Sequence, residues 1–201
     1  MVVPGTYEVS LSERVDGVVT PLGEPQKLDA EALGVASLPA SDKRALLGFQ
    51  QETAALQRAV LGSVRAVEET GNRLDYIARA ILQAPRADAA LSSQARALED
   101  RLHTIDVALS GDSTIRSRSE STPPSIAERV NDVVSGHWTS TSAPTETQRE
   151  AFRIAGAALE PVLEDLRRLL ESDLPALEAK LDEAGAPWTP GRIPRWRRPQ
   201  E

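Results

Sequence analysis

The chain has 201 residues, of which 40% are apolar but only 3% aromatic, and its formal net charge is −7. The acidic balance argues against nucleic-acid binding, and the lack of cysteine excludes disulfides, zinc–thiolate sites and cysteine nucleophiles. No apolar run approaches the ~20 residues that cross a bilayer, and residues 1–5 lack the character of a signal peptide, so we expect neither a membrane span nor a leader.

The first thirty residues show the period-two pattern of a half-buried strand. Tyr7, Val9 and Leu11 alternate with polar residues. Asp16 and Gly17 then form a dipeptide that tolerates the positive φ angles of a tight hairpin turn, and a third short strand is expected at residues 26–28. Because two or three strands are marginal alone in water, we interpret residues 1–30 as a short β-hairpin, the final strands of an immunoglobulin-like sandwich.

From residue 41 the pattern becomes that of a long helix. Ser41 is the expected N-cap, and Pro85 ends the helix or follows its end. Two interleaved sets of uncharged residues at seven-residue steps predict a coiled-coil seam: Leu46, Thr53, Val60, Val67, Leu74 and Ile81, with Phe49, Leu56, Ser63, Thr70, Ile77 and Ala84. Such a helix is about 63 Å long, and Gly71 with Asn72 marks a point where it could break.

A second helix is predicted at residues 87–110, turned back on the first by the short link around Pro85. Its apolar face consists of Leu91, Ala95, Leu98, Leu102, Ile105 and Leu109. Gly111 supplies the stop, and residues 112–121 are predicted to be a surface loop. A short third helix opens at residues 122–124 and turns Ile126, Val130, Val133 and His137 inward, before a loop at residues 139–144.

The last predicted helix begins with a capping box, in which Thr145 is the N-cap and Gln148 lies three residues on. Its apolar stripe runs through Phe152, Ala155, Leu159, Val162, Leu166 and Leu169 toward Leu177 and Leu181. Pro161 and Pro175 fall within it and are expected to bend or interrupt it, and Gly185 marks its end. The sequence therefore predicts a mainly α fold, an antiparallel helical bundle over residues 41–184.

No constellation of residues predicts catalysis, a cofactor or a metal. His103 is interpreted as a partly buried structural histidine, and His137 as a cation at a helix C-terminus. The triplet that begins at Gly111 resembles an esterase nucleophile turn, but it follows a helix, so a helix stop is the better interpretation. Paired carboxylates such as Glu164 and Asp165 fall among arginines and fit a charged outer face.

The tail, residues 185–201, differs from everything before it. It combines tryptophan, proline and arginine, and residues 186–201 carry a net charge of +3. The partner-binding candidates are Trp188, Arg192, Arg195, Trp196 and Arg197, because Trp and Arg are enriched in binding hot spots. Packing of Trp188 back onto the bundle is the alternative that we favour for that residue, and contact with a lipid or nucleic acid is a weaker one.

Several segments together resemble the C-terminal region of bacterial sortilin-like, BNR-repeat propeller proteins, which are often labelled glycosyl hydrolases. They are residues 4–9, residues 111–130, Pro144 with Thr145, and residues 186–194. The resemblance covers nearly the whole chain but only the end of those proteins, without the propeller. It implies an extracytoplasmic or secreted parent, with any glycosidase chemistry in the propellers.

Three functions follow as hypotheses. The first is a non-catalytic structural or interaction module at the end of such a propeller protein, contacting a protein partner or the upstream domains of its parent. The second is a free-standing coiled-coil adaptor that self-associates through the seam at residues 46–81. The third is a part of a glycosyl hydrolase whose active site lies upstream.

Overall fold

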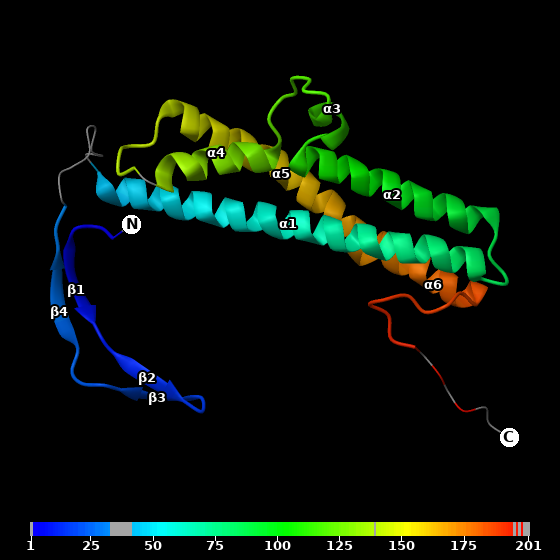
Figure 1. Ribbon diagram of the computed structural model, residues 1–201, viewed down its shortest axis with the longest axis horizontal. Helices are drawn as coiled ribbons and strands as arrows, with labels where there is room; N and C mark the ends of the chain where they lie inside the picture. Colours follow the sequence, from blue (N-terminus) through cyan, green and yellow to red (C-terminus); the bar gives the residue numbers. More distant parts are fainter. Residues whose placement is uncertain (1, 33–41, 139, 195, 197, 199–201) are drawn as a thin grey trace.

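The computed structural model describes residues 2–32, 42–138, 140–194, 196 and 198. It is mainly helical: a long helical bundle carries a small antiparallel β-ribbon at its N-terminal end (Figure 1). The predicted fold class, a helical bundle with long helices and an N-terminal hairpin, is thus confirmed.

The N-terminal strands form one bent two-stranded ribbon, defined here as residues 5–30. Strand β1 (Gly5–Val9) pairs with β4 (Gln26–Ala30), and β2 (Ser12–Val15) pairs with β3 (Val18–Pro21), both antiparallel. Asp16 and Gly17 have φ angles of 48° and 83°, as the predicted two-residue turn requires. Between the two halves the returning strand carries extra residues at 23–25, and such an insertion bends a ribbon.

Helix α1 (Lys43–Gln83) is the backbone of the bundle, and its 41 residues make a rod about 60 Å long. Asp42 is its N-cap, since the carboxylate accepts from the amides of Arg44 and Ala45 at 2.8 and 2.9 Å. The predicted cap at Ser41 lies outside the described residues. The break suggested at Gly71 was wrong: the helix runs through it, because packing against α2 stabilises the helical backbone there.

The predicted seam is the buried face of α1. Ten of its twelve residues are buried, and Leu56 and Ala84 are partly buried. Leu74 and Ile77 are fully inaccessible. The residues that cover the seam come from the chain itself, because α2, α4 and α5 all pack on α1.

Two helices in succession run antiparallel to α1. Helix α2 (Ala89–Ser110) covers its C-terminal half, and α4 (Ile126–Trp138) covers its N-terminal half (Figure 1). The segment between them was predicted to be a loop, but it contains a short helix, α3 (Ser113–Ser117). This helix forms because Asp112 accepts from the amides of Thr114 and Ile115 and from the Thr114 hydroxyl.

The last rod returns along both partners. It consists of α5 (Glu146–Arg168), a π-helical turn η1 (Leu169–Asp173) and α6 (Leu174–Ala184). The predicted capping box is present, with Thr145 and Gln148 exchanging hydrogen bonds of 2.9 and 3.2 Å. Pro161 lies inside α5 without ending it, whereas Pro175 follows the wider π turn, where the Leu174 amide bonds to the Leu169 carbonyl. The prediction of an interruption is therefore confirmed at Pro175 only.

Candidate interaction surfaces

The ribbon has one apolar and one polar face in its β1–β4 half. Residues directly opposite each other in an antiparallel pair lie on the same face, and successive residues alternate between faces. Tyr7 lies opposite Leu28, and Val9 follows on the same face opposite Gln26. The other face is polar: Thr6 donates to Asp29 at 2.7 Å, and Glu8 lies opposite Lys27.

The β2–β3 half repeats the arrangement with one exception. Val15 lies opposite Val18, and Leu11 is joined to Leu22, whose amide donates to the Leu11 carbonyl at 2.8 Å. Between these apolar pairs Glu13 lies opposite Thr20, on the same face. Glu13 is therefore the single charged residue at the paired positions of a mainly apolar face, which also carries Thr20 and Gln26.

None of the described helices lies against the ribbon (Figure 1), and this apolar face is exposed. Its seven large apolar side chains, the set called the ribbon face below, are 39–67% exposed: Tyr7, Val9, Leu11, Val15, Val18, Leu22 and Leu28. Contiguous exposed apolar patches of several hundred Å² are rare on monomeric proteins and mark interaction sites. The ribbon face is thus a candidate contact surface. The sequence pattern had assigned Tyr7, Val9 and Leu11 to a half-buried strand, but in the structure they are exposed.

The first part of the tail forms a second surface, because it is held on its own bundle. Gly185 closes α6 with a φ of 72°, and the chain turns back along the helix (Figure 1). The Arg192 side chain is only 6% exposed; it pairs with Asp182, donates to the Glu178 carbonyl at 3.3 Å and lies 4.7 Å from the Trp188 ring centre. Glu178 in turn pairs with Arg73 of α1 at 2.7 Å. We call the five residues that make these contacts the tail clamp: Arg73, Glu178, Asp182, Trp188 and Arg192.

The predicted partner-binding residues fall into two groups, those that belong to the tail clamp and those that lie beyond it. Arg192 lies inside it, and Trp188 packs against Arg192 while keeping 43% of its surface exposed. Trp196 is 78% exposed, and its neighbour Ile193, which the sequence had not singled out, is 86% exposed. Arg195 and Arg197 lie outside the described residues.

An aromatic cluster closes the end of the bundle nearest the ribbon. The Phe49 ring makes edge contacts with His137 at 5.4 Å and with Phe152 at 5.5 Å, and the Arg149 guanidinium lies 5.5 Å from its centre. Burial lowers the pKa of His137, and the charge of Arg149 lowers it further. His137 does lie in the last turn of α4, as predicted, but its lowered pKa disfavours the cationic form that was expected to interact with the helix end.

His103 also differs from its prediction, because it is exposed. It borders a shallow groove of about 380 Å³ between α1 and α2, together with the carboxylates of Glu68, Glu99 and Asp106. Among the described residues, no group of acidic, histidine or cysteine side chains is arranged to hold a metal ion.

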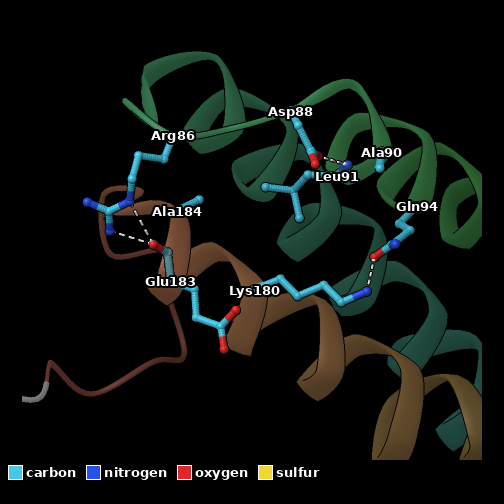
Figure 2. Close-up of a pocket in the computed structure, with 8 residues that line it drawn as sticks. All are labelled: Arg86, Asp88, Ala90, Leu91, Gln94, Lys180, Glu183 and Ala184. Atoms are coloured by element: carbon cyan, nitrogen blue, oxygen red, sulfur yellow. Dashed lines mark hydrogen bonds between the residues drawn. The ribbon is translucent and has the colours of Figure 1, made fainter.

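A wider cleft of about 550 Å³ lies between the start of α2 and the end of α6 (Figure 2). Four of its five polar side chains are engaged with the fold: Arg86 donates to the Glu183 carbonyl, Asp88 caps α2, and Lys180 donates to Gln94 at 2.8 Å. These contacts fix the turn between α1 and α2 against α6, which is a structural task.

Comparison of the chain with models of known protein families, with curated proteins and with solved structures gives no match. The resemblance to the end of propeller proteins therefore stays a prediction. In the part of the chain that the structure describes, no helix has the length and apolarity needed to cross a membrane.

Proposed function

We propose that this chain is a non-catalytic structural and interaction module, with the bundle as a rigid spacer and the ribbon as its docking element. The observation that carries the proposal is the ribbon face. A two-stranded ribbon is marginal by itself in water, and seven large apolar side chains on one of its sides are exposed. A cover supplied by another domain or protein would stabilise it.

The bundle suits the role of a spacer. Helices α2, α4 and α5 pack on α1, and α6 packs on α2, so that buried apolar residues run from Leu46 at one end to Leu181 near the other. Because this core is closed within the chain, the bundle can keep its shape while the ribbon and the tail engage other surfaces.

On the strength of the sequence resemblance, we place the module at the C-terminal end of a larger extracytoplasmic propeller protein. In this proposal any glycosidase chemistry belongs to the propellers, and the chain contacts upstream domains of its parent or a protein partner. The test is the mass of the native product, detected with an antibody raised against residues 43–184. We expect a band several times larger than 21.7 kDa; a band at 21.7 kDa would refute the placement.

The free-standing adaptor is weakened as an alternative by the burial of the seam. Self-association through residues such as Val60 and Val67, which are 2% and 6% exposed, would require the bundle to open. Sedimentation equilibrium of the purified chain tests this. We expect no dimer that forms through the seam. A dimer whose formation changes hydrogen exchange in the peptides that contain Val60 and Val67 would restore the alternative.

A further inference from the structure

The strongest unexplained feature is the ribbon face with its single charge. Glu13 lies between the Leu11–Leu22 and Val15–Val18 pairs, and all of these side chains are exposed. A carboxylate in the middle of a dry contact loses its hydration, which costs several kcal/mol, and an opposite charge is needed to offset that cost. Whatever covers this face must therefore be apolar around one cationic group.

The overall charge of the segment points the same way. Residues 2–32 carry six carboxylates against two cationic side chains, a net charge of −4. Two copies of the ribbon placed face to face would bring these like charges together, which disfavours a second copy as the occupant. An anionic lipid surface is disfavoured for the same reason.

The shape of the face identifies the class of partner. Each half of the bent ribbon is a pair of strands with alternating side chains, and such a pair packs well on another sheet, about 10 Å away, with interdigitating apolar side chains. Glu13 carries the single charge among the paired positions of this face, so the ion pair that it forms decides the register of the two sheets.

We propose that the ribbon face docks on the apolar face of a β-sheet in another folded domain, and that this sheet presents one lysine or arginine to Glu13. The inference rests on the proposed function and deepens it by stating the partner's chemistry. It also assigns a specific task to Glu13, which sets where along the ribbon the two sheets meet.

The test uses the full chain with a photoreactive phenylalanine analogue at one position, expressed in the cells that produce the protein. Val18 and Val19 form a matched pair: both are exposed valines of β3, but Val18 lies on the ribbon face and Val19 lies opposite Arg14 on the other side. We expect crosslinks from position 18 and none from position 19. Mass spectrometry then locates the crosslinked residue, which should lie in a β-strand with a lysine or arginine nearby.

The charge requirement is tested by substitution in the same experiment. Glu13→Lys should lower the crosslink yield from position 18 about tenfold, because like charges then meet at the interface. Glu31→Lys, the same charge reversal at an exposed position beyond the end of β4, should leave the yield unchanged. In the described part of the chain no strand packs extensively on a helix, so helical circular dichroism should be the same in both variants.

The outcomes separate this inference from the proposed function. Crosslinks to a helix, to a second copy of the chain, or equally from positions 18 and 19 would overturn the sheet partner and leave an interaction module. Co-sedimentation with zwitterionic or anionic lipid vesicles, lost in Val18→Glu but not in Val19→Glu, would overturn it in favour of a membrane surface. No crosslink from either position and no vesicle binding would overturn both.

Discussion

Replacing Arg192 by glutamine should release the tail from the bundle without unfolding the helices. In the wild-type chain the Arg192 guanidinium is buried, and its contacts reach Asp182, the Glu178 carbonyl and the Trp188 ring. The substitution removes a charge-assisted hydrogen bond, worth about 1.5–3 kcal/mol, and a cation–π contact, worth about 0.5–1 kcal/mol.

The partner left behind moderates this cost. Breaking a fully buried ion pair costs about 3–5 kcal/mol, mostly because the remaining charge is left without water. Asp182 is 39% exposed and can be hydrated again, and glutamine keeps part of the packing. We therefore expect a local loss of about 1.5–2.5 kcal/mol, which corresponds to a roughly 13- to 70-fold larger population of the open turn.

Hydrogen exchange followed by mass spectrometry measures this opening directly. The amide of Arg192 bonds to the Thr189 carbonyl at 3.3 Å, so a peptide covering residues 186–194 reports on the clamp. Exchange in this peptide should accelerate in Arg192→Gln, while peptides from α1 and α6 stay unchanged. Arg198→Gln, at an exposed position, is the control. Equal exchange in Arg192→Gln and the wild type would show that the tail clamp contributes nothing and would refute the reasoning.

Four further substitutions test the bundle. Gly71→Ala should raise the free energy of unfolding by about 0.5–1 kcal/mol in urea titration, because alanine favours the helix and its Cβ would lie an ordinary 3.7 Å from the nearest side-chain atom. Gly62→Ala, with open space around it, is the control and should raise the free energy of unfolding by as much. A loss of stability at Gly71 alone would mean that the helices approach each other more closely there. Thr145→Ala should cost about 1 kcal/mol by removing the cap of α5, and an unchanged midpoint would contradict the capping box seen with Gln148. His137 has a pKa in the folded state below its unfolded value, so the unfolded chain binds the proton first and stability should fall as the pH drops below about 6.5. In His137→Phe this part of the pH dependence of stability should vanish. An identical slope of stability against pH in both chains would contradict the lowered pKa of His137.

Local sequence pattern sufficed for the helices because their period and their caps are local properties. The seam on α1 and the stripe on α2 coincide with the buried faces, and Thr145 with Gln148 caps α5 as expected. The turn at Asp16 and Gly17 follows from the same kind of short-range chemistry. These features need only the spacing of apolar residues and the backbone preferences of a few others.

The candidate surfaces needed the tertiary structure, since they depend on which segments meet. The sequence spacing of Arg73, Glu178 and Arg192 does not predict that they form one network, because they come together only when the tail turns back at Gly185. The neutral state of His137 depends likewise on Phe49, 88 residues earlier in the chain, which buries the ring.

What the sequence determined by itself is therefore the set of helices and the faces that they bury. The tertiary structure decided that α1 satisfies its seam within the chain, while the ribbon keeps its apolar face exposed. The physical reason is that apolar periodicity states that a face must be covered, but not by what. On α1 the cover is the chain's own helices; on the ribbon, we propose, it is another protein surface.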